Sequence, residues 1–422
     1  MRRRGIAVVG GGPAGLAAAI AAKEAGCGDV LLIERDRHLG GILNQCIHDG
    51  FGLHRFKEAL SGPEYAARYI ARFEELGIPA LLNTIVLDLS RDRKLLLSRE
   101  GGLEEIEADA VVLAMGCRER ARGALSIPGH RPPGVYTAGA AQNFVNMENI
   151  MPGNKVCILG SGDIGLIMAR RMTLEGASVE AVFELLPYSS GLPRNIQQCL
   201  VDYGIPLYLS TTVVDIVGMD RLEGVTVAEV DEKRMPILGT ERFVPCDTLL
   251  LSVGLIPENE LAREAGVELD PTTGGPRVDD ACMTSVTGIF SCGNALHVHD
   301  LVDWVSEEAA RAGASAAAYA VSDAGRGTER TVKVSASSGV RYVMPDRISS
   351  GTLSSGGGIS LAFRVLCPSR DGVVEVLSGD EVLKAEKHAR LHPAEMVRVE
   401  MSAEDMRKLA TSGNGRLEVR VR

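Results

Sequence analysis

The sequence has few aromatic residues and no apolar run long enough to span a membrane. A transmembrane helix needs about 20 consecutive apolar residues, and no segment of the 422-residue chain approaches that length. Aromatic side chains make up 4% of the chain, and we expect its one tryptophan, Trp304, to lie in the core. The apolar stretch after Met1 is interrupted by a glycine-rich loop, so we assign it to the fold rather than to a secretion signal. We therefore expect a cytoplasmic protein without a membrane span.

A basic stripe is also absent. The 45 Lys and Arg residues are outnumbered by 55 Asp and Glu residues, which gives a formal net charge of -10. Proteins that bind nucleic acid or an anionic membrane surface need clustered positive charge. We therefore expect neither nucleic acid nor a lipid surface as a partner.

Closely spaced cysteines are missing as well. None of the nine cysteines forms a CxxC pair, and the two closest in sequence are Cys282 and Cys292. This spacing argues against a zinc ribbon, an iron–sulfur cluster and a thioredoxin-like dithiol. We expect no metal site, and most of the cysteines are predicted to pack as small apolar side chains.

Glycine, in contrast, is abundant, and some of it forms two loops of one design. The 48 glycines include those of Gly10-Gly11-Gly12-Pro13-Ala14-Gly15 and Gly160-Ser161-Gly162-Asp163-Ile164-Gly165. A glutamate, Glu34 or Glu184, follows 24 residues after the first glycine of each loop. A short apolar strand precedes each loop, and a helix and a second strand follow it. Two such units predict two dinucleotide sites and electron transfer between two cofactors.

Each part of such a loop has a physical role. The first glycine allows a sharp turn, the second lets a pyrophosphate approach the backbone, and the third lets helix and strand pack closely. The phosphate charge then rests on the helix N-terminus, while the glutamate accepts hydrogen bonds from ribose hydroxyls. A carboxylate at Glu184 repels a 2′-phosphate, which favours NAD over NADP, although the nearby Arg194 can soften this preference.

The predicted elements after each loop follow the same order. Those after the first loop are a helix over 62–76 and strands over 83–89, 94–98 and 110–114; those after the second are strands over 212–217, 225–230 and 248–253. This repetition indicates an internal duplication. A further glycine-containing segment, 287–294, precedes a predicted helix over 301–320 and has no duplicate. We expect it to complete one of the two domains.

The last 90 or so residues contain few motifs that indicate a function. Residues 335–360 are rich in serine and glycine, and short β-like runs are predicted at 361–366, 373–377, 381–385 and 396–401. The segment Ser402-Ala403-Glu404-Asp405 is predicted to cap a final short helix. We expect a small β-rich appendage, and we advance its docking to a partner as a hypothesis.

In their order along residues 1–323, these motifs resemble the two-dinucleotide-binding-domain flavoproteins of the pyridine nucleotide-disulfide oxidoreductase family, which includes thioredoxin reductase and glutathione reductase. The motifs that carry the resemblance are the two loops, Ala114-Met115-Gly116, Ser252-Val253-Gly254 and Gly288 to Asn294. The resemblance implies an α/β fold of two Rossmann-like domains, with the NAD domain inserted in the FAD domain. The implied boundaries are 1–123 and 257–330 for the FAD-binding domain, 124–256 for the NAD-binding domain and 331–422 for the β-rich C-terminal domain.

The same resemblance implies which residues bind each cofactor. Those implied for FAD are Gly10, Gly12, Pro13, Ala14, Gly15, Glu34, Arg35, Gly40, Gly41, Val86, Ala114, Met115, Gly116, Gly293, Asn294 and Val302. Those implied for NAD are Gly160, Gly162, Asp163, Ile164, Gly165, Glu184 and Gly254. Asn294 stands where the family usually has aspartate, and its amide can still hydrogen-bond a hydroxyl of the flavin ribityl chain.

The chain departs from the family at the redox disulfide. Thioredoxin reductases place a CxxC before the second nucleotide loop, where this chain has Ala138 and Ala141. Glutathione-reductase relatives place two cysteines shortly after the paired glycines, and here the matching stretch offers only Cys46. One sulfur cannot form an internal disulfide, so we expect a branch that lacks this centre.

Three residues are candidates for chemistry beside the flavin: Cys46, His48 and His299. Cys46 is a reactive thiolate if His48 lowers its pKa, or else a neutral packed cysteine. His299, together with His297, either polarises the carbonyl edge of the flavin or simply forms the entry to the following helix. The sequence leaves both alternatives open.

The amino-acid sequences of residues 40–56 and 184–195 are similar to those of a disulfide-free branch of FAD-containing oxidoreductase subunits. They are found with an anaerobic glycerol-3-phosphate-dehydrogenase-like flavoprotein and a small cysteine-containing protein. This resemblance implies hydride exchange between NAD(H) and FAD, with electrons passing to or from a partner dehydrogenase subunit whose substrate is glycerol 3-phosphate or another small hydroxy or amino acid. The alternatives are an NADH oxidase or peroxidase using Cys46 and a non-catalytic flavin-binding scaffold subunit. All three are compatible with a homo-oligomer.

Overall fold

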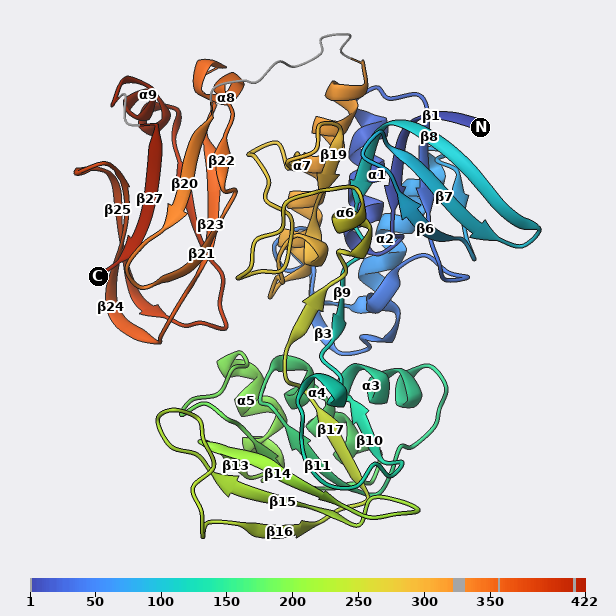
Figure 1. Cartoon of the computed structure of the whole chain (residues 1–422), viewed down its shortest axis with the longest axis vertical. Coiled ribbons are helices and arrows are strands. Elements are labelled where there is room, and N and C mark those ends of the chain that lie inside the picture. The colour runs from blue at the N-terminus through green and yellow to red at the C-terminus, as the bar shows by residue number, and fades with distance from the viewer. Residues whose placement is uncertain (1, 322–330, 356, 413–414) are drawn as a thin grey trace. The chain divides into compact units, whose positions relative to one another are not determined.

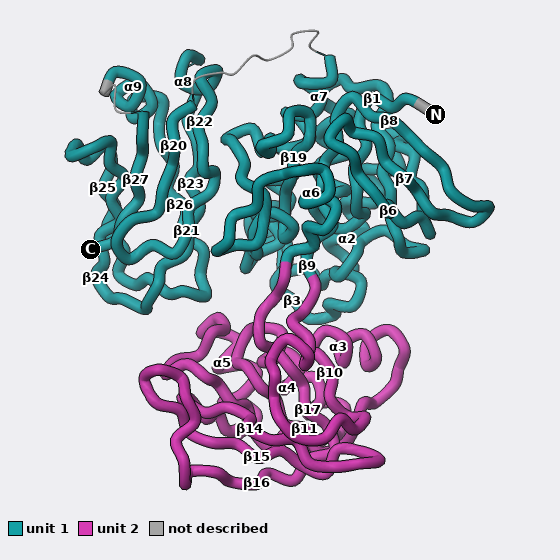
Figure 2. The backbone as a smooth tube through the Cα atoms, viewed as in Figure 1, with its two compact units in different colours: residues 1–117, 257–422 teal, residues 118–256 magenta. Residues whose placement is uncertain are grey.

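The computed structural model describes residues 2–321, 331–355, 357–412 and 415–422. The chain forms two compact units, residues 1–117 with 257–422 and residues 118–256 (Figure 2). The second unit is thus inserted in the chain of the first. The crossings lie in two short strands that pair with each other, β9 (Cys117–Glu119) and β18 (Leu255–Pro257).

The larger unit is built around a seven-stranded sheet. Its strands are β1 (Arg2–Val9), β2 (Val30–Ile33), β5 (Ala80–Leu81), β6 (Ile85–Leu89), β7 (Lys94–Arg99), β8 (Gly102–Leu113) and β19 (Ile289–Ser291). Strands β5, β2, β1 and β8 are parallel neighbours, and β19 pairs with β8. All four residues of β2 are buried, as expected for a parallel strand covered on both faces. Strands β6 and β7 extend the sheet as antiparallel neighbours.

Helices α1 (Pro13–Glu24), α6 (Glu260–Glu264) and α7 (Val302–Val321) contact this sheet, and α2 (Gly62–Glu75) packs on α1 (Figure 1). The shorter elements of this unit include η1 (Gly41–Gln45), β3 (Asp49–Phe51), β4 (Leu60–Ser61) and η4 (Gly293–Ala295). Ser61 and Glu64 form a reciprocal capping box that fixes the start of α2. Helices α1 and α7 approach closely because Gly313 has no side chain and faces the backbone of Ala18.

The smaller unit repeats this plan with a five-stranded parallel sheet. The sheet, in order, consists of β10 (Val135–Thr137), β17 (Thr248–Leu251), β11 (Lys155–Leu159), β12 (Ser178–Phe183) and β13 (Leu207–Tyr208). The remaining elements are η2 (Arg122–Ala124), α3 (Ala138–Asn146), α4 (Asp163–Leu174), α5 (Pro193–Cys199), η3 (Val201–Tyr203) and the antiparallel strands β14 (Thr211–Val217), β15 (Gly224–Glu229) and β16 (Arg242–Pro245). The strand–loop–helix–strand order of β11, α4 and β12 matches that of β1, α1 and β2. The prediction of two Rossmann-like α/β units is confirmed.

The C-terminal part of the larger unit is β-rich, as predicted. Its elements are β20 (Val332–Ala336), β21 (Val340–Met344), β22 (Arg347–Ile348), α8 (Ser350–Ser355), β23 (Ile359–Val365), β24 (Ser369–Ser378), β25 (Glu381–Leu391), β26 (Val397–Met401), α9 (Ala403–Ser412) and β27 (Arg416–Val421). They form a five-stranded and a three-stranded sheet around one shared apolar core. Ser402 caps α9 through reciprocal hydrogen bonds with Asp405, as the sequence indicated. The serine- and glycine-rich stretch, for which no strand was predicted, contains β21, β22 and part of β20.

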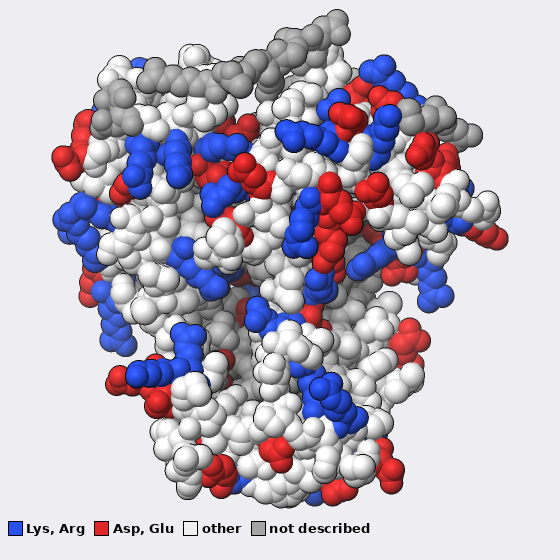
Figure 3. All heavy atoms as spheres, viewed as in Figure 1, with Lys and Arg blue, Asp and Glu red and all other residues white. Residues whose placement is uncertain are grey.

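The surface carries charges of both signs. On the face shown in Figure 3, basic and acidic side chains are interspersed among uncharged ones. Among the described residues, no helix is long and apolar enough to cross a membrane.

The contact between α1 and α7 predicts the effect of adding one methyl group. A Cβ at Gly313 would overlap the backbone carbonyl of Ala18, so Gly313→Ala forces the two helices apart. We expect a net destabilisation of about 1–3 kcal/mol, even though alanine is the better helix former. Thermal or urea unfolding of the purified protein measures this. Gly28→Ala, which meets no atom within 4 Å, is the matched control and should leave stability nearly unchanged.

Candidate functional site

The first glycine loop connects β1 to α1, and its shape depends on missing side chains. Gly10 has a φ of +106°, and a Cβ there would lie 2.5 Å from the carbonyl oxygen of Ala114. A Cβ at Gly15 would overlap the carbonyl oxygen of Gly10, so only glycine lets the helix leave the loop at this angle. The loop therefore runs directly against the end of β8.

The second position of the loop leaves the backbone open. A Cβ at Gly12 would meet only the Cα of Gly41, at 3.9 Å, while a Cβ at Gly41 would lie 2.9 Å from the Cα of Gly12. Gly12 is also the N-cap of α1 and provides no side-chain cap, so the first-turn amides have no side-chain acceptor there. Uncapped amides at the N-terminus of a 12-residue helix are a suitable site for a diphosphate.

A buried glutamate fixes this loop. Glu34 is 7% exposed, and its Oε2 accepts a hydrogen bond from the Gly11 amide at 2.5 Å. Its Oε1 accepts from the Asp36 amide at 2.7 Å. Each carboxylate oxygen can accept a further hydrogen bond, so both retain capacity for a ribose hydroxyl.

The second loop, between β11 and α4, reproduces this arrangement. Gly160 has a φ of +96° and its α-carbon faces the carbonyl of Ser252. Glu184, 5% exposed, accepts hydrogen bonds from the Ser161 amide at 2.9 Å and the Leu186 amide at 2.9 Å. The same two bonds, to the residue after the first loop glycine and to the second residue after the glutamate, are made by Glu34.

The second loop also has hydroxyl groups that the first lacks. Ser161 Oγ donates to Glu184 at 2.5 Å, and Ser190 Oγ donates to the same oxygen at 3.1 Å. Ser252 Oγ accepts from the Gly165 amide at 3.0 Å. These three serines are functional candidates that the sequence analysis did not single out. The sequence could have indicated Ser252, because it is the first residue of the Ser252-Val253-Gly254 motif, which lies beside the loop.

The remaining residues implied for NAD lie at the loop or at the end of β17. Asp163 begins α4, and its Oδ1 accepts from the Leu192 amide at 2.8 Å and from Asn195 Nδ2 at 2.7 Å. Ile164 follows it in the first turn. Gly254 follows β17, and its carbonyl accepts from the Arg120 amide at 3.0 Å.

Segments far apart in sequence meet at the first loop. A Cβ at Gly293 would contact the Ala14 side chain, which places η4 against the start of α1. Asn294, the next residue, accepts from the His299 amide at 3.0 Å through Oδ1 and donates to Cys117 Sγ at 3.6 Å through Nδ2. The structure thus brings together the loop, the end of β8 and η4.

Other residues implied for FAD lie around this point. Pro13 is the first residue of α1, and Gly40 is the N-cap of η1, with a φ of +108°. Met115 and Gly116, both half-buried, follow Ala114 at the end of β8, and Val302 begins α7.

Arg35 lies near Glu34 in the sequence, and Val86 lies near it through strand β6. Arg35 follows Glu34 directly and is exposed. Val86 is half-buried in β6, just after Thr84, whose amide donates to the Glu34 carbonyl at 3.0 Å. Strand β6 therefore begins beside the glutamate.

Cys46 ends the η1 segment in a buried position. Its thiol donates to the Ile42 carbonyl at 3.3 Å, and burial raises its pKa from 9.0 to about 12. His48 is half-buried, with its ring 5.0 Å from that of Phe51. The proposal of a low-pKa thiolate at Cys46 is not supported, because removal from water stabilises the neutral thiol. All nine cysteines lie in the described ranges, and none forms a disulfide.

His297 and His299 form a buried group with Glu308 of α7. The distances from Glu308 Oε2 are 2.9 Å to His297 Nε2 and 3.5 Å to His299 Nε2. Burial alone would raise the pKa of Glu308, but attraction from His299 and His297 holds it well below its ordinary value. Glu308 was missed by the sequence analysis, since a single acid on a helix gives no local signal.

The expectation that Trp304 lies in the core is wrong. Trp304 is half-buried, and the Arg398 guanidinium lies over its ring at 4.2 Å from the ring centre. The ring of His54 also lies near it, 4.8 Å away between ring centres. A cation from a distant strand covers this ring, which the local sequence could not indicate.

Known proteins share both the sequence pattern and the fold. The sequence profile of the family described as "Pyridine nucleotide-disulphide oxidoreductase" matches residues 4–322. Among similar proteins, hydrogen cyanide synthase subunit HcnB of Pseudomonas aeruginosa is 28% identical over 342 residues, covering 74% of this chain and 70% of HcnB. The benzene 1,2-dioxygenase system ferredoxin–NAD(+) reductase subunit of Pseudomonas putida is 30% identical over 299 residues, covering 68% of this chain and 66% of that protein.

An opine oxidase subunit of Agrobacterium tumefaciens is 26% identical, and the match covers 68% of this chain but only 60% of that protein. Among solved structures, T. acidophilum thioredoxin reductase has a TM-score of 0.62 at 21% identity, over 76% of this chain and 100% of that one. The NAD-dependent persulfide reductase from A. fulgidus has a TM-score of 0.56 at 21% identity, over 88% of this chain and 67% of that one. These structures share the fold.

The environment of Cys46 predicts its reactivity. A shift in pKa from 9.0 to about 12 lowers the thiolate population at pH 8 about a thousandfold, and the thiolate is the reacting form. Iodoacetamide should therefore modify Cys46 at least a hundredfold more slowly than the exposed Cys367, which serves as the internal control. Timed alkylation of the folded protein followed by peptide mass spectrometry measures both rates. Equal rates would show that Cys46 is accessible and ionised.

Proposed function

The chain belongs to the pyridine nucleotide-disulphide oxidoreductase family, and we propose that it exchanges hydride between NAD(H) and a bound FAD without a redox disulfide. The observation that carries the proposal is the repeated geometry of the two loops. In each unit, a buried glutamate binds the amide that follows the first loop glycine. Two equivalent dinucleotide sites in one chain suit the transfer of electrons from one cofactor to another.

We assign FAD to the loop of the larger unit. The first-turn amides of α1 would bind the diphosphate, and the open backbone at Gly12 would admit its close approach. Glu34 would accept a hydrogen bond from a hydroxyl of the adenosine ribose. Asn294, the middle residue of η4, would bind the ribityl chain through its amide. FAD supplies the two-electron chemistry when bound, and the chain binds and orients it.

We assign NAD(H), in preference to NADP(H), to the loop of the smaller unit. Glu184 is buried at the end of β12, where the ribose of the adenosine half would lie. A 2′-phosphate there would place like charges together in a poorly solvated site. Three hydrogen bonds to its Oε2 hold this carboxylate in place. A carboxylate that cannot move away would exclude the 2′-phosphate of NADP(H).

Electrons would then pass between the flavin and another protein, in either direction. The positions of a thioredoxin-reductase-like disulfide hold Ala138 and Ala141, both buried in α3. Similar proteins are subunits of multicomponent systems, namely a hydrogen cyanide synthase, a dioxygenase system and an opine oxidase. We propose as partner a second flavoprotein dehydrogenase subunit of the glycerol-3-phosphate type, or one acting on another small hydroxy or amino acid, together with a small cysteine-containing protein. We place this complex in the cytoplasm.

The alternatives fit less well. An NADH oxidase or peroxidase needs a reactive sulfur, and burial of Cys46 disfavours its thiolate. A non-catalytic scaffold needs no second nucleotide loop, yet the second loop is at least as extensively hydrogen-bonded as the first. His48 remains a candidate for contact with the flavin, whereas the His299 side chain lies against Glu308.

An anaerobic titration tests the proposed activity. NADH should bleach the oxidised flavin absorption band near 450 nm at about one equivalent, and NADPH should do so with at least a tenfold weaker apparent affinity. Bleaching by neither nucleotide would contradict the proposal for this chain and favour the scaffold.

The nicotinamide preference should depend on Glu184. Glu184→Gln removes the charge but retains the shape, so the ratio of NADH to NADPH affinity should fall about tenfold, or about 1.4 kcal/mol. Glu34→Gln is the matched control, since it makes the same change in the other loop. It should weaken retention of FAD and leave the preference between the nicotinamides unchanged. The two variants are compared by stopped-flow reduction of the flavin with each nucleotide.

A further inference from the structure

A group of three side chains in the larger unit has the composition of a metal site. His297 and His299 come from the loop between η4 and α7, and Glu308 comes from the second turn of α7. Their side chains are 1%, 3% and 9% exposed, and one ligand atom from each lies within 4.8 Å of the others. We propose that these three residues bind one divalent transition-metal ion through two imidazoles and one carboxylate.

The spacing of the ligand atoms suits an ion between them. A tetrahedral ion bound at about 2.0–2.1 Å needs its ligand atoms about 3.3–3.4 Å apart. The distances from Glu308 Oε2 to the Nε2 atoms of His297 and His299 are 2.9 Å and 3.5 Å. The third separation, between the two imidazole nitrogens, is no more than 4.8 Å. Side-chain rotations would have to bring all three separations to the value that the ion needs.

The outer atoms of two ligands are already oriented. Glu308 Oε1 accepts the Gly293 amide at 2.8 Å, which leaves Oε2 to face the imidazoles. His297 Nδ1 lies 3.5 Å from the Tyr342 hydroxyl, on the side of the ring opposite Nε2. Hydrogen bonds to the non-ligating atoms of histidine and carboxylate ligands are typical of metal sites, because they fix the tautomer and the orientation.

The third ligand, His299, is oriented differently from the other two. Its Nδ1 is buried and has no hydrogen-bond partner among the described residues. Packing rather than a hydrogen bond therefore holds this side of the His299 ring, while Nε2 faces Glu308.

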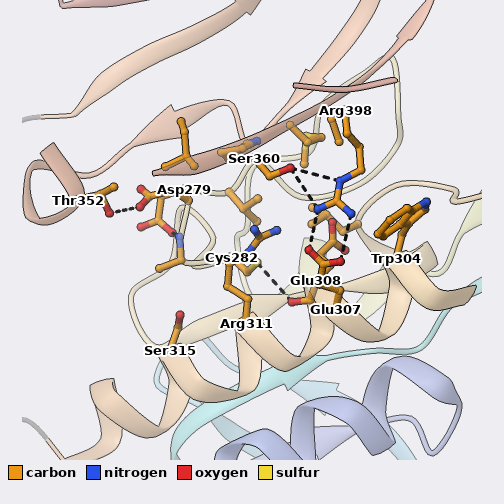
Figure 4. Close-up of a pocket in the computed structure, with 18 of the residues that line it drawn as sticks. Asp279, Cys282, Trp304, Glu307, Glu308, Arg311, Ser315, Thr352, Ser360 and Arg398 are labelled. Carbon is orange, nitrogen blue, oxygen red and sulfur yellow. Dashed lines mark hydrogen bonds and ion pairs between the residues drawn. The ribbon is translucent and has the colours of Figure 1, made fainter. Parts of the chain in front are cut away.

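The group also borders a cavity, which leaves room for a fourth ligand. His299 and Glu308 line a cavity of about 460 Å³ between α7 and the C-terminal strands β23 and β26. Figure 4 shows Glu308 on α7 beside Glu307, with Arg311 one turn further along the helix. Three protein ligands with one open position are typical of zinc sites that bind water or substrate, and two histidines with one carboxylate also bind Fe²⁺. Zn²⁺ and Fe²⁺ are therefore the two ions to distinguish.

Metal analysis of the untagged flavoprotein tests this. After removal of metal with a chelator, the protein is dialysed anaerobically against a slight molar excess of Zn²⁺ or Fe²⁺. Bound metal is then measured by mass spectrometry, together with flavin content. We expect one ion per chain, and the ion retained by the protein as purified identifies which of the two it binds.

Two variants and one control assign the ligands. His299→Ala and Glu308→Gln should each weaken metal affinity at least a hundredfold. His388→Ala is the matched control, because His388 forms a partly exposed pair with Glu386, 3.7 Å apart, and should leave the stoichiometry at one. A similar loss in this control would overturn the proposal.

Metal binding by the wild-type protein tests the proposal even if the variants do not fold. Wild-type protein that binds neither ion at one equivalent under these conditions would show that the three side chains form only a hydrogen-bonded network. This outcome is independent of flavin reduction by NADH, which tests the proposed oxidoreductase activity.

Discussion

The two dinucleotide loops depend on one interaction, a buried carboxylate that accepts a hydrogen bond from the loop backbone. Glu34 and Glu184 are almost fully removed from water, which is costly for a charged group unless hydrogen bonds replace its hydration. The loop amide supplies such a bond in both cases, and the amide two residues beyond the glutamate supplies another. The interaction joins the loop to the end of the next strand.

The two loops share this design but differ in their side chains. In the second loop, Ser161 and Ser190 donate further hydrogen bonds to the glutamate, and Ser252 binds the amide of the third glycine. In the first loop, the space beside the backbone is bounded by Gly41 instead. Hydroxyl groups therefore hold the second carboxylate in place, whereas a glycine lies beside the backbone of the first loop.

Helix α7 connects the core of the seven-stranded sheet to the C-terminal strands. Gly313 lets it pack closely on α1, and Glu308 binds the backbone of η4 beside the first loop. On its outer side, Glu307 forms an ion pair with Arg398 of β26 at 2.7 Å. Helix α7 thus contacts both the first loop region and the C-terminal strands.

The sequence by itself determined the two glycine loops, their glutamates and the helices and strands around them, because turn geometry and apolar runs are local properties. It did not indicate β21 and β22, which lie in a polar, glycine-rich stretch and exist because they pair with strands distant in sequence, such as β23 and β20. Only the tertiary structure brought Glu308 to His297 and His299, covered Trp304 with Arg398 and buried the Cys46 thiol. Burial, pKa and ligand geometry are set by neighbours from elsewhere in the chain, and local sequence does not encode them.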